Sequence, residues 1–198
     1  MNQNNSDTRR SFMKKAVATT GITGGLLGSA QTVAAAEPTL EINGRNSGYY
    51  TIRVNTEDVA PKEGVSNSNI SHPAPGISWL EGSTSDGSYH NYVVNGNIYA
   101  AHLRGSMLIQ RFDMGSYGLN RYGDITVSGQ DGNYTIGTTS KISEKSDLES
   151  TDYIQATNQC TGDMNGDDTD VWDGEGSIKI INATTNDTQM LIEQANIK

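Results

Sequence analysis

The sequence contains almost no cysteine and few positive charges. Cys160 is the only cysteine among 198 residues, so no disulfide can form within the chain. Each folded unit must therefore depend on its apolar core for stability. The chain has 14 Lys and Arg residues against 23 Asp and Glu residues, and its formal net charge is −9. This balance argues against nucleic acid and anionic lipid as partners, because both attract proteins through positive charge.

Long apolar runs and helical patterns are also missing. No segment after the N-terminus is long and apolar enough to span a membrane. No stretch keeps the apolar spacing of one helix face, so we expect no long helix. Residues 142–148 and 190–197 are the only places where the sequence allows a short one. Catalytic patterns are absent as well. None of the histidines, His72, His90 and His102, lies at metal spacing or in a nucleophile motif, so the sequence favours a protein that is not an enzyme.

The first 36 residues have the features of an export signal. Arg9 and Arg10 precede an uncharged segment, 16–36, which is rich in Gly, Ala and Thr and ends in three alanines. This pattern predicts a twin-arginine signal peptide cleaved after Ala36, and the alternative is a disordered basic tail. The segment is too polar to remain as a membrane helix, so we expect no membrane insertion after cleavage. Cleavage removes four basic residues and one acidic residue, leaving 22 acidic against ten basic residues and a net charge of −12.

Two parts of the remaining chain resemble each other. The segments Leu40-Glu-Ile-Asn-Gly44 and Tyr50-Thr-Ile-Arg-Val-Asn55 return as Ile125-Thr-Val-Ser-Gly129 and Tyr134-Thr-Ile-Gly-Thr-Thr139, shifted by 85 and 84 residues. The repeat predicts a first β-unit over 37–113, a linker over 114–123 and a second β-unit over 124–198. Later matches, shifted by 80 residues, pair Gly82, Tyr92, Gly96, Ile98 and Ala100 with Gly162, Trp172, Gly176, Ile178 and Ile180.

Alternation of apolar and polar residues predicts short β-strands throughout both units. Leu40 and Ile42 alternate with polar residues, and the same holds around Ile52. We expect a hairpin at 44–48, another at Asn95-Gly96, and a long loop over 56–78. The fold class is therefore all-β, an antiparallel β-sandwich built from two copies of a unit of roughly 80 residues. Units this small bury little surface, which favours packing of the halves on each other over independent tandem sandwiches.

Together these features support a resemblance to a class of known proteins. The twin-arginine signal, the acidic composition and the Leu-x-Ile-x-Gly and Tyr-x-Ile-x-Val patterns resemble the small secreted β-proteins of halophilic archaea, most of which are uncharacterised. The resemblance implies a secreted or cell-surface protein that folds before export and stays hydrated in concentrated salt. The export route also carries cofactor proteins, so the resemblance does not exclude a cofactor.

The densest group of acidic residues lies at 163–175. Oxygen-bearing side chains alternate there in the way that suits Ca²⁺, which takes six to eight oxygen ligands. The pattern departs from the helix–loop–helix calcium motif, which needs Gly at position 6 and Glu at position 12, where this chain has Asp168 and Gly174. The alternative is an acidic turn without an ion. The predicted ligands are Asp163, Asn165, Asp167, Asp173 and Glu175.

Several single residues are candidates for modification or contact. Tyr117 and Tyr122 lie in the predicted linker, where no core position explains them, and are therefore candidate contact residues. Cys160 is either a cross-link to a second chain or a small buried side chain. Asn-x-Ser/Thr motifs predict glycosylation at Asn69, Asn133, Asn182 and Asn186.

From these observations we expect an exported, non-enzymatic β-sandwich protein of the cell envelope or medium that acts by binding or assembly. Its partner would be an envelope component or a second copy of the chain, and no cofactor is expected apart from calcium. One alternative is a calcium-dependent binding module or secreted enzyme that uses residues 163–175. Another is an adhesive filament subunit, whose strand edges would pair with other chains.

Overall fold

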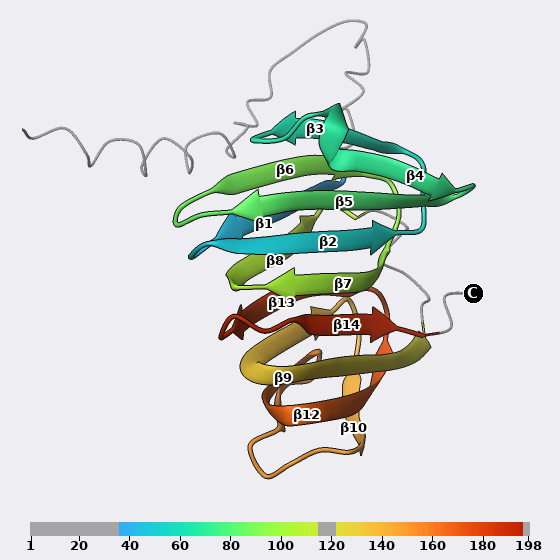
Figure 1. Ribbon diagram of the computed structural model, residues 1–198. Helices are drawn as coiled ribbons and strands as arrows, with labels where there is room; N and C mark the ends of the chain where they lie inside the picture. The colour runs from blue at the N-terminus through green and yellow to red at the C-terminus, as the bar shows by residue number, and fades with distance from the viewer. Residues whose placement is uncertain (1–35, 115–121, 196–198) are drawn as a thin grey trace, which may run out of the picture. The chain divides into compact units, whose positions relative to one another are not determined.

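The computed structural model describes residues 36–114 and 122–195, and these residues are all-β. They form one 14-stranded antiparallel sheet that folds back on itself and is nearly closed into a barrel (Figure 1). The described residues contain no α-helix, only a 3-10 turn at Asn67–Asn69. None of them forms a helix long and apolar enough to cross a membrane. The predicted signal peptide, residues 1–36, lies outside the described residues except for Ala36.

Eight strands come from the first part of the chain. Their alternating burial follows the sequence pattern, since Leu40, Ile42, Tyr50 and Ile52 are fully buried. The strands are β1 (Thr39–Gly44), β2 (Gly48–Val54), β3 (Val59–Glu63), β4 (Ile70–Ala74), β5 (Ile77–Thr84), β6 (Tyr89–Val94), β7 (Ile98–Arg104) and β8 (Ser106–Phe112).

The second part of the chain has two much longer strands. β9 and β12 are 17 residues each and pair with one another along almost their whole length. The register shifts between Asn165 and Asp168, and Gly166 within this bulge has a positive φ of 82°, which glycine adopts readily. The strands are β9 (Tyr122–Thr138), β10 (Ile142–Ser146), β11 (Tyr153–Ala156), β12 (Gln159–Glu175), β13 (Ile178–Thr185) and β14 (Met190–Gln194).

The strand pairings of the first part recur in the second. β1 pairs with β6 and β8, and β2 pairs with β5 and β7. The first half of β9 occupies the place of β1, because it pairs with β14 and with the second half of β12. The second half of β9 occupies the place of β2, because it pairs with β13 and with the first half of β12. β10 and β11 both pair with β12. In the same way, β3 pairs with β6 and β4 pairs with β5.

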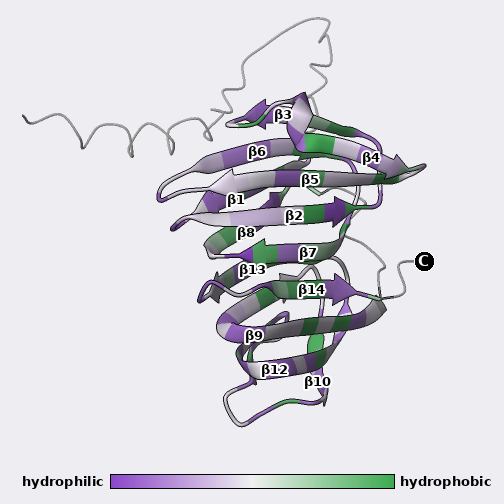
Figure 2. Cartoon of the chain, in the orientation of Figure 1, coloured by the Kyte–Doolittle hydropathy of each residue, from purple (hydrophilic) through white to green (hydrophobic). Residues whose placement is uncertain are grey.

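Two further ladders join the parts of the chain. β8 pairs with β13, and β14 pairs with β7. The order across the sheet is therefore β3-β6-β1-β8-β13-β9-β14-β7-β2-β5-β4. Buried apolar side chains from both parts make one continuous core, and Figure 2 shows apolar residues interleaved with polar ones along the strands.

The structure corrects several local predictions. The two predicted hairpins are wrong, because neither β1 with β2 nor β6 with β7 forms a ladder, although each pair is consecutive in the chain. The predicted loop 56–78 contains β3 and β4, and the two segments left open for a short helix contain β10 and β14. Residues 163–175 belong to strand β12 rather than to a turn. β3, β4 and β10 are short outer strands and β12 contains a bulge, and strands of these kinds are hard to recognise from alternation.

Candidate functional site

A chain of hydrogen bonds between buried polar side chains lies in the core of the second part. The Trp172 indole donates to the Tyr134 hydroxyl at 2.8 Å, and that hydroxyl donates to Oδ2 of Asp170 at 2.5 Å. All three side chains are at most 1% exposed. Alternation along β12 points Asp170 and Trp172 to the same inner side of the strand. A carboxylate is thereby held in the core at the end of a fixed network.

The first part of the chain has a corresponding group. The hydroxyls of Tyr50 and Tyr92 lie 2.9 Å apart, and the Tyr50 hydroxyl lies 2.7 Å from Nδ1 of His90. By the shifts of the sequence repeat, Tyr50, Tyr92 and His90 correspond to Tyr134, Trp172 and Asp170, so an imidazole replaces the carboxylate. The comparison shows that the fold tolerates either group at this position.

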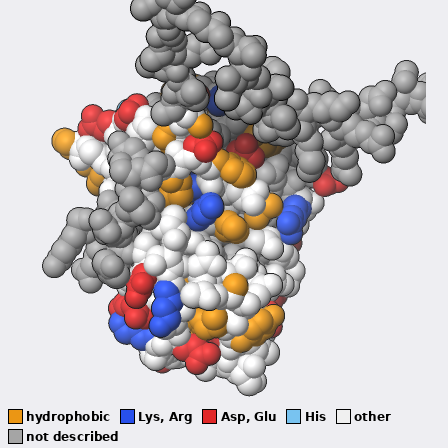
Figure 3. All heavy atoms as spheres, turned by 180° about the vertical axis from the view of Figure 1, so that it is seen from behind, with side chains coloured by type: hydrophobic (Ala, Val, Ile, Leu, Met, Phe, Trp, Pro, Cys, Tyr) orange, Lys and Arg blue, Asp and Glu red, His pale blue; other side chains and the backbone are white. Residues whose placement is uncertain are grey.

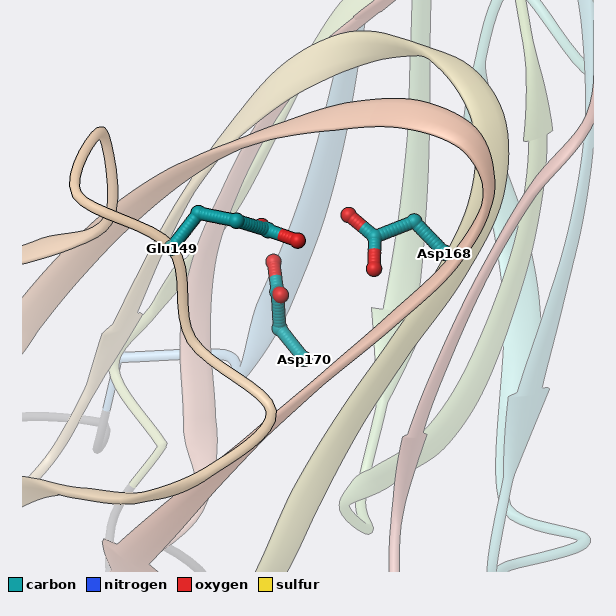
Figure 4. Close-up of side chains that lie close together, drawn as sticks. All are labelled: Glu149, Asp168 and Asp170. Atoms are coloured by element: carbon teal, nitrogen blue, oxygen red, sulfur yellow. The ribbon is translucent and has the colours of Figure 1, made fainter.

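Asp170 is one of three carboxylates that converge. Its ligand atom and those of Glu149 and Asp168 all lie within 4.8 Å of one another. Figure 4 shows the three side chains pointing toward a common centre, Glu149 from the segment between β10 and β11 and the other two from β12. Asp170 is fully buried, whereas Glu149 is exposed, so the cluster opens to solvent on the Glu149 side.

Asp152 holds Glu149 in place without belonging to the cluster. Its Oδ2 accepts the main-chain N–H of Glu149 at 2.7 Å, and its Oδ1 accepts that of Asp163 at 3.1 Å. The main-chain N–H of Asp152 in turn donates to the carbonyl of Glu149 at 3.1 Å. These bonds close the turn over 149–152 and fasten it to β12.

The charges of the cluster have no compensating partner among the described residues. Within 36–114 and 122–195, no Lys, Arg or His side chain forms an ion pair with Glu149, Asp168 or Asp170. Oδ1 of Asp170 and Oδ2 of Asp168 are buried and accept no hydrogen bond. A buried carboxylate oxygen without a donor is costly, and natural proteins usually provide a partner for it. The arrangement is thus suited to a cation or to a proton.

Electrostatics agree with this description of the cluster. The pKa of Asp170 is raised to about 7, mainly by burial and also by the negative charges of Asp152, Asp168 and Glu149, although the Tyr134 hydrogen bond lowers it. The pKa of Glu149 is also raised, first by desolvation and then by the charge of Asp168. Both shifts mean that negative charge is disfavoured here unless a positive charge joins the group.

The first part of the chain has the same turn without the charges. The N–H of Asn69 donates to the Ser66 carbonyl at 3.0 Å, and Oδ1 of Asn69 accepts the Ser66 N–H at 3.0 Å, as in the Glu149–Asp152 turn. Across the two parts, Ser66 thus corresponds to Glu149 and Asn69 to Asp152. By the 80-residue shift, Ser88, just before β6, and His90, on β6, correspond to Asp168 and Asp170. The acidic cluster is confined to the second part.

The five predicted calcium ligands lie elsewhere on β12. Asn165, Asp167 and Asp173 are exposed, and Asp163 and Glu175 are half-buried, on the side of the strand opposite to Trp172. Asp167 accepts a hydrogen bond from Gln130 at 2.7 Å, and Glu175 accepts one from Ser140 at 3.4 Å. The structure does not group these five residues, so this ligand set stays a prediction.

The sequence analysis missed Glu149, Asp168 and Asp170. A signal was present for the last two, because a continuous strand through Trp172 places every second residue, including Asp168 and Asp170, on the buried side. Glu149 joins them only through the fold.

The remaining candidate residues are dispersed. Asn133 and Asn186 are exposed and Asn182 is half-buried on β13, whereas the side-chain amide of Asn69 donates to the Glu81 carbonyl at 2.8 Å. Cys160 is fully buried, and burial raises the pKa of its thiol to about 12, so a cross-link to another chain would require β12 to open. Tyr122 begins β9, and Tyr117 lies outside the described residues.

No family model, no curated protein and no solved structure matches the chain.

Proposed function

We propose that the protein is an exported, non-enzymatic binding protein of the cell envelope or medium, and that its acidic cluster holds a divalent cation. One observation carries the cation site: three carboxylates converge, and two of their buried oxygens have no hydrogen-bond donor. A divalent cation would supply the missing positive charge. The export route and compartment rest on the twin-arginine pattern and on the resemblance to secreted proteins of halophilic archaea.

The proposal includes the interpretation of the chain as a duplicated unit folded into one β-sandwich. The sequence repeat supports it, and so do the matching strand pairs and the corresponding Tyr50 and Tyr134 networks. Buried polar contacts at the ends of β8 and β14 correspond as well. Arg111 donates to the Gly96 carbonyl at 2.6 Å, and Gln194 donates to that of Gly176 at 2.7 Å.

Assembly by strand addition receives less support than binding. The outer strands β3, β4, β10 and β11 have five, five, five and four residues. β3 carries Pro61 and Lys62, and β4 carries Pro73, which are features that protect sheet edges from pairing with other chains. The face drawn in Figure 3 is largely uncharged and polar, with apolar side chains only in scattered groups.

Thermal unfolding with and without divalent cation tests the proposed site. At a free cation concentration about 100-fold above the dissociation constant, binding adds about 2.7 kcal/mol, which raises the melting temperature of a chain this size by about 5–10 °C. We expect a chelator, at constant ionic strength, to remove that increase.

The first part of the chain supplies a matched variant. Glu149→Ser combined with Asp168→Ser and Asp170→His gives the second part the residues that the corresponding positions of the first part hold. We expect this variant to fold and to melt at one temperature with or without cation. An unchanged melting temperature of the natural protein after chelation would exclude the site.

A further inference from the structure

We infer that the cation is calcium and that it fastens the turn over 147–152 to strand β12. The inference rests on the proposed cation site and adds the identity of the ion and its effect on the protein.

The spacing of the ligand atoms suits calcium. Oxygens on opposite sides of a calcium ion lie up to about 5 Å apart, because calcium–oxygen distances are about 2.3–2.6 Å. One ligand oxygen each from Glu149, Asp168 and Asp170 lies within 4.8 Å of the other two, so a single calcium ion can reach all three.

The difference in burial between the ligands also favours calcium. Asp170 is fully buried and its Oδ1 has no donor, so the ion must lose water to reach it. Magnesium gives up water reluctantly and demands near-ideal octahedral geometry, whereas calcium accepts irregular shells of six to eight oxygens. The exposed side at Glu149 leaves room for water ligands.

The cluster joins two segments that would otherwise repel each other. Glu149 faces Asp168 and Asp170 across the gap between the turn and β12. The Asp152 carboxylate accepts hydrogen bonds from the N–H groups of Glu149 and Asp163. The turn also packs against the core through Leu148, which is only partly buried. A cation between the three carboxylates converts this repulsion into an attachment. Asp152 is then a positioning residue that holds Glu149 toward the ion.

The corresponding turn of the first part shows what remains without an ion. Ser66 and Asn69 make the same two hydrogen bonds, and Ser88 and His90, which the sequence repeat matches to Asp168 and Asp170, carry no carboxylate. That turn therefore needs no cation, and only the second one should respond to calcium.

Two measurements on the full chain test the inference. The first is isothermal titration with CaCl₂ and, separately, with MgCl₂ at equal ionic strength, after removal of bound cations. We expect calcium to bind at least tenfold more tightly than magnesium. Glu149→Gln should weaken calcium binding at least tenfold, and Asp152→Asn about tenfold or more through loss of positioning. Glu144→Gln, which makes the same charge change at an exposed position of β10, should leave binding unchanged.

The second measurement is hydrogen–deuterium exchange of residues 147–152. Calcium should slow exchange there at least tenfold and leave residues 64–69 unaffected.

The outcomes separate the inference from the proposed function. Equal affinity for calcium and magnesium would overturn calcium as the ion but leave the cation site standing, whereas no binding of either ion would remove both. Binding without slower exchange over 147–152 would overturn the attachment of the turn. Equal losses of affinity in Glu149→Gln and Glu144→Gln would show that calcium binds to the acidic surface in general.

Discussion

At the scale of single residues, the two parts of the chain share one packing constraint. A Cβ atom on Gly82 would lie 2.5 Å from the Tyr50 hydroxyl, and one on Gly162 would lie 2.5 Å from the Tyr134 hydroxyl. Each buried tyrosine therefore points its hydroxyl onto a glycine of the neighbouring strand. The recurrence of Gly and Tyr at these positions follows from this contact.

Gly162→Ala should destabilise the protein. The added methyl group would meet both the Tyr134 hydroxyl and Oδ1 of Asp152, at 2.6 Å, so it would disturb the core network and the 149–152 turn together. We expect the free energy of unfolding in urea to fall by about 1–3 kcal/mol. Gly137→Ala is the control, because its Cβ would approach no atom closer than 3.3 Å. Similar losses in both variants would contradict the constraint.

His90 should make the free energy of unfolding fall as the pH is lowered. A histidine that gains an acidic partner on folding would have the opposite effect. Burial lowers the pKa of His90 below 6.5, so the unfolded chain binds the proton more readily than the folded chain. The contribution of His90 to stability is present above pH 6.5. It is lost as the pH falls from 6.5 toward the pKa of His90 in the folded protein. Urea unfolding at pH 7.5 and 5.5 should show a smaller pH effect in His90→Gln than in the half-exposed control His102→Gln. Equal effects would exclude this role.

The sequence predicted part of this residue-level arrangement. The sequence repeat matches Tyr50 with Tyr134 and Tyr92 with Trp172, and all four side chains are buried. Their hydrogen-bond partners were not predictable, since His90 lies 40 positions after Tyr50 and Asp170 lies 36 positions after Tyr134, and only the fold brings them together. Glu149 was still harder to predict as a member of the cluster, because it lies 19 positions before Asp168 in the sequence.

At the scale of elements, alternation located the strands but not their partners. β1 and β2 lie where the alternation around Leu40, Ile42 and Ile52 predicts strands, because each of them buries one face. The predicted strand pairings were wrong because turn signals such as Asn95-Gly96 indicate only that the chain changes direction. They do not indicate which strand the next strand pairs with. Here the strands that follow these turns form ladders with strands elsewhere in the chain.

The protected edge of β3 leads to a prediction of its own. Pro61 lacks an N–H group and Lys62 carries charge, so both discourage an incoming strand. Pro61→Val with Lys62→Thr should produce concentration-dependent oligomers on a sizing column. Pro75→Val, in the turn between β4 and β5, should remain at the size of the natural protein. A double variant that does not change in size at high concentration would show that the edge is protected by other means.

At the scale of the whole molecule, the ladders β8–β13 and β14–β7 make the two parts interdependent. We expect the full chain to unfold in one transition, detected alike by Trp172 fluorescence and by circular dichroism. A fragment of residues 37–113 should remain unfolded, because β7 and β8 would each lose a partner strand. A fragment that melts cooperatively would favour independent tandem units.

The reciprocal form of these two ladders has an evolutionary consequence. When the last strand of each part pairs with the next-to-last strand of the other, the contact has the twofold character of a homodimer interface. The proposed duplication then amounts to the fusion of two subunits into one gene. In a homodimer every substitution appears twice, so an acidic cluster would be present in both subunits or in neither. Fusion removes that restriction, and it lets one half acquire Glu149, Asp168 and Asp170 while the other keeps serine and histidine.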